Sequence, residues 1–147
     1  MSVLELLKRK SGGVISLESS AGVTAATRLL MHHGIGGLPV VDDRGSLVGF
    51  VSEREVVAAV DDHAQEVREL PVESIMRRPA PMCRSEDSIQ RVMERMTRER
   101  LRHLVVLQGD RIVGVISVGD LVKHRLEQLE TETGVLRDYV AAQRAMR

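Results

Sequence analysis

The sequence predicts an α/β (α+β) fold made of two β-α-β-β-α repeats, related by a pseudo-twofold axis and packed sheet to sheet. The first observation is an internal repeat: LVGFVSEREVV at residues 47–57 returns as IVGVISVGDLV at residues 112–122, with four of eleven positions identical and five conservative. The second is that short apolar runs alternate with segments whose apolar residues recur at helical spacing in both copies. Because one three-stranded sheet cannot bury both of its faces alone, two copies packed together would close one core.

The first repeat begins with a predicted strand in VISL, residues 14–17. A helix follows, in which apolar and small residues recur at helical spacing: Val23, Ala26, Thr27 and Leu30. LPVV at 38–41 predicts a buried strand, and DDRGS predicts a hairpin turn into a strand in LVGFVS. Ser52 can cap the next helix, and Glu55 can complete a capping box. The second repeat has the same order, with Ser117 and Asp120 at the capping positions.

The whole chain divides into five parts. We predict an N-terminal helix at 1–12, the first repeat at 13–61, a linker at 62–78, the second repeat at 79–124 and a C-terminal helix at 125–147. Ser2 and Glu5 form another candidate capping box, and VESIM at 72–76 predicts a short helical turn. After the second repeat, residues step alternately by four and three positions in a heptad-like seam: Val122, Leu126, Leu129, Thr133, Leu136 and Val140. Gly134 interrupts this seam and predicts a weak point in the helix.

The composition argues against several classes of partner. The 147 residues include 21 basic and 21 acidic side chains, whereas proteins that bind duplex nucleic acid usually carry a basic excess. An aromatic fraction of 1% argues against stacking on single strands. The chain has no apolar run of about 18 residues for a membrane span, and its N-terminus lacks the apolar region of a signal peptide. We therefore expect a cytoplasmic protein that binds neither nucleic acid nor membranes.

No pattern in the chain indicates catalysis or a metal site. The histidines and Cys83 lack the spacing of metal ligands, so we expect no metal. The sequence has no phosphate-binding glycine motif of the Walker A or Gly-x-Gly-x-x-Gly type, and no credible Ser/His/Asp set. Cys83, in the short strand PMCR, is interpreted as a small buried apolar residue rather than a nucleophile. We interpret the chain as a sensor or binding module and not as an enzyme.

Two stretches, GIGGLPVVDDRGSLVGFVSEREVV at 34–57 and RLRHLVVLQGDRIVGVISVGDLV at 100–122, resemble a tandem pair of CBS domains, the modules named after cystathionine β-synthase. VESIM ahead of the second copy adds to this resemblance, which covers almost the whole chain. The chain resembles CBS-domain proteins of the stand-alone bacterial type. The resemblance implies a regulatory module whose central cleft holds an adenosine-containing ligand, commonly AMP, ADP or ATP and in some members NAD(H) or S-adenosylmethionine. It also implies a homodimer with two modules face to face, and a regulated protein that the sequence does not identify.

Ser117 and Asp120 lead the candidate ligand-binding residues. A carboxylate can accept hydrogen bonds from both hydroxyls of a ribose, and the helix N-terminus suits a phosphate. The family pattern implies that this pair cooperates with the first strand and the glycine-containing segment of the other copy, with Arg102 and His103 near the phosphate. The implied site is Val14, Ile15, Ile35, Gly36, Gly37, Arg102, His103, Val115, Ser117 and Asp120. Alternatively, Ser117 and Asp120 serve only as a helix cap, and Gly36 and Gly37 serve only turn geometry.

The equivalent site of the other copy departs from the pattern, because Glu55 stands where the family has Asp. The extra methylene moves the carboxylate, so we expect this site to be the weaker one. Its candidate residues are Ser52, Arg54, Glu55, Ala80, Pro81 and Leu101. Arg54 could hold a phosphate with two hydrogen bonds. The alternative function is a nucleotide-independent dimeric scaffold that acts through Leu126, Leu129 and Leu136.

Overall fold

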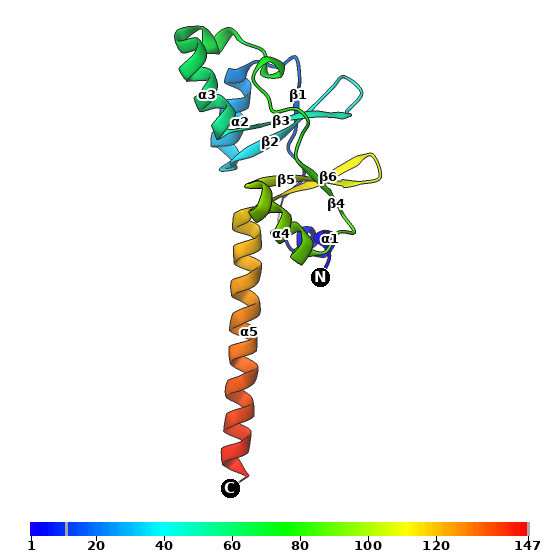
Figure 1. Cartoon of the computed structure of the whole chain (residues 1–147), viewed down its shortest axis with the longest axis vertical. Helices are drawn as coiled ribbons and strands as arrows, with labels where there is room; N and C mark the ends of the chain where they lie inside the picture. Colours follow the sequence, from blue (N-terminus) through cyan, green and yellow to red (C-terminus); the bar gives the residue numbers. More distant parts are fainter. Residues whose placement is uncertain (11, 147) are drawn as a thin grey trace.

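Two three-stranded sheets, stacked face to face, form the body of the molecule in the computed structural model, which describes residues 1–10 and 12–146 (Figure 1). The first sheet has the order β1 (Leu17–Glu18), β2 (Gly37–Val41), β3 (Leu47–Ser52), and the second β4 (Met82–Arg84), β5 (His103–Gln108), β6 (Arg111–Ser117). In both sheets the first pair of strands is parallel and the second antiparallel. The predicted fold class and duplicated unit are confirmed. Ser11 and Arg147, which the predicted ranges 1–12 and 125–147 include, lie outside the described residues.

The two sheets meet through apolar side chains. Phe50, Ala80, Val105 and Leu107 are buried there, with Leu47, Met82, Ile112 and Val115 partly buried around them. Gly37, which neighbours Phe50 on the adjacent strand, leaves room for the aromatic ring, because a Cβ added at Gly37 would overlap it. The packing of the two repeats therefore depends on the absence of a side chain at position 37.

Helices cover the outer face of each sheet. α2 (Val23–His33) and α3 (Glu53–His63) lie on the first sheet, where Ala26 and Leu30 of α2 pack against Leu38, Val40 and Val51. α4 (Ile89–Glu99) covers the second sheet through Ile89, Val92 and Met96, in the same core as Cys83. Each repeat therefore has its own helix-covered core, and the layer between the sheets joins the two.

The N-terminal helix α1 (Val3–Arg9) packs against the second repeat, although it precedes the first repeat in the chain. Val3 and Leu6 are buried in the second core, and the Val3 amide donates to the Asp87 carbonyl at 2.9 Å. The predicted capping box of Ser2 and Glu5 is present. This crossing brings the end of α1 close to the start of the last helix.

The predicted linker packs along the first repeat. It contains two 3₁₀ helices, η1 (Ala64–Glu69) and η2 (Val72–Ser74), so the helical turn predicted within 72–76 is present. Val72 is fully buried in the core of the first repeat. Arg77 extends the edge of β3, because its amide donates to the Phe50 carbonyl at 2.7 Å and its carbonyl accepts from the Phe50 amide at 3.0 Å.

Two predicted elements differ from the structure. The strand expected over 14–17 is limited to Leu17–Glu18, because Val14 and Ile15 leave the sheet and line a cavity instead. Gly134 does not interrupt the last helix, because α5 (Val118–Ala145) runs from the second repeat without a break. The helix expected at 125–147 is therefore a continuation of the last helix of the second repeat. One glycine costs only about 1 kcal/mol in a helix interior, which neighbouring helix-forming residues offset.

α5 projects away from the body as one long helix (Figure 1). At about 1.5 Å per residue, its 28 residues extend for about 42 Å. Within residues 1–10 and 12–146, no helix, α5 included, is both long and apolar enough to cross a membrane.

The packing around Phe50 predicts that Gly37→Ala will destabilise the protein. The new methyl group would overlap the ring, and overpacking of a core typically costs about 1–3 kcal/mol. Gly13→Ala is the matched control, because nothing lies within 4 Å of its added Cβ. Thermal unfolding should show a lower melting temperature for Gly37→Ala only. Equal melting temperatures for the two variants would contradict this account of the sheet interface.

Candidate functional site: two unequal cavities between the repeats

A cavity of about 700 Å³ lies between the two repeats, and we name it the Asp120 cavity. The first repeat contributes residues 12–15 and 33–37, and the second contributes β6 and the first turn of α5. Nine of the ten residues predicted for the leading site line it: Val14, Ile15, Ile35, Gly36, Gly37, His103, Val115, Ser117 and Asp120. The fold thus brings together residues that are up to 106 positions apart in the chain.

The Asp120 carboxylate holds the N-terminus of α5 and retains a free acceptor. Ser117 and Asp120 form a capping box, in which the Asp120 amide donates to Ser117 Oγ at 3.2 Å and the Ser117 amide donates to Asp120 Oδ2 at 2.9 Å. In the described part of the chain, Oδ1 accepts no hydrogen bond. The cap and an available carboxylate oxygen therefore coexist, so the capping role leaves ligand binding open.

Lys10, at the end of α1, contacts the same carboxylate. Its Nζ lies 2.9 Å from Asp120 Oδ2 and donates to the Val115 carbonyl at 3.0 Å. The lysine side chain is 43% exposed and the aspartate side chain 24%, so the ion pair is partly open to solvent. Sequence reasoning missed Lys10, because this contact depends on the crossing of α1 to the second repeat, and the local pattern around residue 10 carries no signal for it.

Gly36 and Gly37 lie at the wall of the Asp120 cavity, but their backbone angles do not require glycine. Neither residue has a positive φ, so turn geometry does not explain them. A Cβ at Gly36 would lie 3.0 Å from His103 Nε2, and a Cβ at Gly37 would meet Phe50. Both glycines therefore make room for the rings of protein side chains.

A second cavity, of about 730 Å³, contains the other capping box, and we name it the Glu55 cavity. Ser52, Arg54, Glu55 and Pro81 of the predicted weaker site line it. Glu55 Oε2 accepts from the Ser52 amide at 2.9 Å and is also hydrogen-bonded to the Ser52 hydroxyl, so this carboxylate folds back on its own cap.

Three predicted site residues lie elsewhere. Ala80 is buried between the sheets, and Leu101 is 6% exposed in the core of the second repeat, so neither lines the Glu55 cavity. Arg102 was expected in the Asp120 cavity, but it lines the Glu55 cavity. Arg102 precedes β5 on the side of the Glu55 cavity, whereas its neighbour His103 lines both cavities, as does Gly36.

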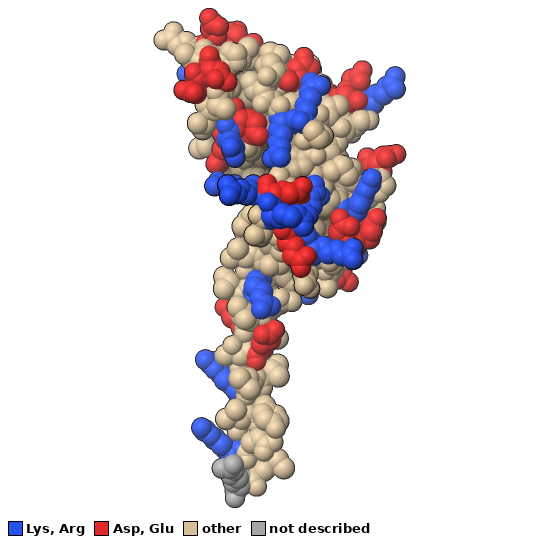
Figure 2. Space-filling model, in the orientation of Figure 1, with Lys and Arg blue, Asp and Glu red and all other residues tan. Residues whose placement is uncertain are grey.

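The two cavities differ in charge. Sequence reasoning did not place Arg77 or Arg100 at a site, yet the Glu55 cavity is lined by four arginines and three acids: Arg54, Arg77, Arg100, Arg102, Glu53, Glu55 and Asp61. The Asp120 cavity has Lys10 and Asp120 with two histidines, His33 and His103. Basic and acidic side chains are interleaved on the face of the body seen in Figure 2. The duplication therefore gives two pockets of similar size and different chemistry.

His103 lies where the two cavities meet. It lines both, and its ring centroid is 5.5 Å from that of Phe50. Burial lowers the pKa of His103, and the nearby Lys10 charge lowers it further, against the opposing effect of nearby carboxylates. The imidazole is therefore neutral at neutral pH in the free protein.

Cys83 is buried in the second core, as predicted from its apolar surroundings. Burial raises the pKa of its thiol to about 12, with a further contribution from the charge of Asp87. A thiol with so little thiolate is a poor nucleophile. Among the described residues, no group of three or more His, Cys, Asp or Glu side chains could hold a metal ion.

Comparison with known proteins identifies the family. The profile of the CBS domain matches residues 5–62 and 72–127, so the chain belongs to the CBS-domain family as a tandem pair. The CBS-domain containing protein ATU1752 of Agrobacterium tumefaciens has a crystal structure that is 32% identical in sequence, with a TM-score of 0.79 over 84% of this chain and 92% of that one. Hypoxic response protein 1 of Mycobacterium tuberculosis is 28% identical over 78% of this chain and 80% of its own length.

One similar structure contains a nucleotide. The CBS domain protein PAE2072 of Pyrobaculum aerophilum, solved as a complex with AMP, is 26% identical, with a TM-score of 0.77 over 90% of this chain and 99% of that one. Other relatives are much longer than this chain. It spans 39% of an uncharacterized protein and 22% of an inosine-5′-monophosphate dehydrogenase, both from Methanocaldococcus jannaschii and both 28% identical.

The lowered pKa of His103 predicts a pH-dependent contribution to stability. The unfolded chain takes up a proton at His103 near the ordinary pKa of about 6.5, whereas the folded protein does so only at lower pH. This contribution is complete above that pKa and is lost as the pH falls through it towards the folded pKa. Urea unfolding across this range should therefore depend less on pH in His103→Gln than in the wild type.

His63→Gln is the matched control for this prediction, because His63 is exposed at the end of α3. The control should keep the pH dependence of the wild type. An unchanged pH dependence in His103→Gln would show that the buried imidazole does not titrate in this way.

Proposed function

We propose that this protein is a regulatory sensor that binds an adenosine-containing ligand in the Asp120 cavity, with AMP, ADP or ATP as the preferred class and NAD(H) or S-adenosylmethionine as the alternative. The observation that carries the proposal is the free Oδ1 of Asp120, at a helix N-terminus, in a cavity lined by both repeats. The likeness to a CBS-domain protein in complex with AMP supports it. We propose binding rather than catalysis, because this chain matches only 22% of the length of the inosine-5′-monophosphate dehydrogenase.

The cavity offers a suitable group for each part of such a ligand. Asp120 accepts hydrogen bonds from the ribose hydroxyls, and the apolar side chains of Ile15, Ile35 and Val115 provide a surface for adenine. Lys10 and the N-terminus of α5 supply positive charge for a phosphate. In this role Lys10 takes the place that the family pattern gave to Arg102.

Regulation follows from the ion pair between α1 and α5. A ribose that is hydrogen-bonded to the Asp120 carboxylate competes with Lys10 for that carboxylate. Ligand binding therefore changes the contact between the N-terminal helix α1 and the projecting helix α5. A ligand shifts such an equilibrium only by its difference in affinity for the two states. We infer that the module acts in the cytoplasm as a homodimer, and that the altered helices contact a regulated protein.

The exposed apolar residues along α5 favour a second candidate, a dimeric scaffold that needs no nucleotide. A thermal-shift panel of AMP, ADP, ATP, NAD, NADH and S-adenosylmethionine separates the two functions. A ligand at about 100 times its dissociation constant adds about 2.7 kcal/mol to stability. Stabilisation by at least one member supports the sensor, whereas no stabilisation by any member supports the scaffold.

Asp120→Asn should weaken adenine-nucleotide binding with little loss of stability. Asparagine keeps the shape and can still cap α5, but it removes the charge that accepts the ribose hydroxyls. Hydrogen bonds to charged groups are worth about 1.5–3 kcal/mol, so calorimetry should show affinity lower by about ten- to a hundredfold. 2′-Deoxy-AMP should show much of the same loss on the wild type and little further loss on the variant.

The exposed Asp43→Asn is the control for the loss of a carboxylate, and it should leave both affinity and melting temperature unchanged. If Asp120 is only a helix cap, Asp120→Asn will leave the affinity of the folded protein for the nucleotide unaltered.

Glu55→Asp should improve binding in the Glu55 cavity. The shorter side chain restores the carboxylate that the family pattern places after Ser52, and it removes the methylene that folds Glu55 Oε2 back on the Ser52 hydroxyl. Calorimetry should then show a higher stoichiometry, or a tighter weak phase. Unchanged stoichiometry and affinity would show that the carboxylate at position 55 does not decide the difference between the cavities.

A further inference from the structure

The projecting helix α5 carries an apolar seam that faces away from its own body. Leu121 and His124 are the buried residues of α5, whereas the seam residues are exposed, among them Leu126 at 56% and Leu136 at 62%. The seam follows the sequence positions noted above: Val122, Leu126, Leu129, Thr133, Leu136 and Val140. Since the body already packs on the other side of the helix, the seam is free to meet a partner.

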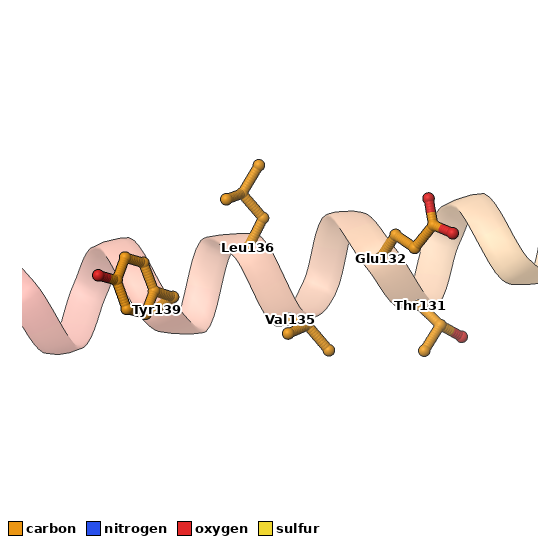
Figure 3. Close-up of a pocket in the computed structure, with 5 residues that line it drawn as sticks. All are labelled: Thr131, Glu132, Val135, Leu136 and Tyr139. Atoms are coloured by element: carbon orange, nitrogen blue, oxygen red, sulfur yellow. The ribbon is translucent and has the colours of Figure 1, made fainter.

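The residues of α5 fit a heptad repeat closely. Leu126, Thr133 and Val140 occupy the a positions, and Val122, Leu129 and Leu136 occupy the d positions. In Figure 3, Leu136 projects from α5 on the same side as Glu132, and Val135 and Thr131 project on the opposite side. Val135 therefore lies off the seam, although it is 65% exposed.

The charges beside the seam match a parallel second copy. Arg125 and Glu132 are g residues, and Glu130 and Arg137 are e residues. In a parallel coiled coil, each g residue lies next to the e residue five positions further along the other helix. Arg125 then meets Glu130 of the second copy, and Glu132 meets Arg137 of the second copy.

Within the described residues, none of these four side chains forms an ion pair in its own chain. They are therefore available to a second helix. The projecting part of α5 shows few charged side chains on the face seen in Figure 2.

An antiparallel pair fits less well. The antiparallel register that buries all six seam residues pairs Val122 with Val140, Leu126 with Leu136 and Leu129 with Thr133. That register brings Glu130 next to Glu130 of the second copy, and Glu132 next to Glu132. Like charges face each other at both positions, which disfavours the antiparallel arrangement.

We propose that α5 forms a parallel, two-stranded coiled coil with a second copy of this chain over residues 122–140. The proposal rests on the homodimer inferred above and does not depend on the ligand. Most helical stability in proteins comes from the packing of an apolar face, and the first turn of a helix is its most costly part to form. Here the body holds the first turns of α5 through the Ser117 cap and the buried Leu121, so the helix is already formed when two copies meet.

The first test uses Leu129→Lys/Leu136→Lys, because both side chains are exposed and their loss leaves the body intact. Light scattering at high micromolar concentration should give twice 16.3 kDa for the wild type and 16.3 kDa for the variant, and both proteins should still unfold cooperatively. Val135→Lys is the matched control off the seam and should stay dimeric. A monomeric wild type, or a variant that stays dimeric, would overturn the proposal, and neither result bears on ligand binding.

The second test distinguishes the two orientations. Position 143 is the next d position after Leu136. In a parallel pair the two copies of Gln143→Cys face each other, so mild oxidation should link two copies only when the helices are parallel. Asp138→Cys, on the outer face of α5, is the control, and the native Cys83 is buried. Absence of cross-linking through position 143 would overturn the parallel arrangement.

Charge exchange provides a third readout. Glu132→Arg should raise the dimer dissociation constant by about two- to tenfold, as expected for exposed ion pairs. Glu132→Arg/Arg137→Glu should bring it back towards the wild-type value, because the pair with the second copy is restored. A double variant as weak as the single one would overturn the proposed register.

Discussion

The packing of the two sheets against each other is the contact on which the rest of this structure depends. Phe50, Val105 and Leu107 fill the layer between the sheets, and Gly37 leaves space for the aromatic ring. Because the repeats meet face to face, the Asp120 and Glu55 cavities are both lined by residues of the two repeats, and His103 belongs to both. Any ligand in either cavity therefore contacts both halves of the molecule and can report on how they are packed.

The two cavities differ because the two halves of the chain have different surroundings. α1 crosses to the second repeat and delivers Lys10 to Asp120. Glu55 caps its helix in the same way as Asp120, but within the described residues it forms no ion pair. One cavity thus combines a single carboxylate with one ammonium group and two histidines, and the other is crowded with guanidinium groups. A simple duplication has acquired two chemically distinct pockets, and only the first is connected directly to both terminal helices.

Much of this fold could be predicted from local signals in the sequence. The repeated LVGFVS and IVGVIS strands, and the capping boxes at Ser52 and Ser117, identify the duplicated unit and the helix starts. Most of the residues of the Asp120 cavity could be named because the resemblance to CBS-domain pairs implies that Ser117 and Asp120 meet the first strand and the glycine segment of the other copy. The role of Lys10 could not be predicted, since its contact with Asp120 depends on where α1 packs. Arg102 was expected in the Asp120 cavity but lines the Glu55 cavity, because no local pattern shows on which side a residue before a strand lies. The weak point at Gly134 was predicted from the low helix propensity of glycine alone. The helix propensity of the other residues of this 28-residue helix offsets that cost, and the helix is continuous.

The most direct test of the central claim is a crystal structure of the protein grown with AMP at saturating concentration. We expect AMP in the Asp120 cavity, with its ribose hydroxyls on the Asp120 carboxylate and with Lys10 Nζ displaced from Oδ2 towards the phosphate. AMP bound only in the Glu55 cavity, or two cavities that both stay empty at saturation, would contradict it.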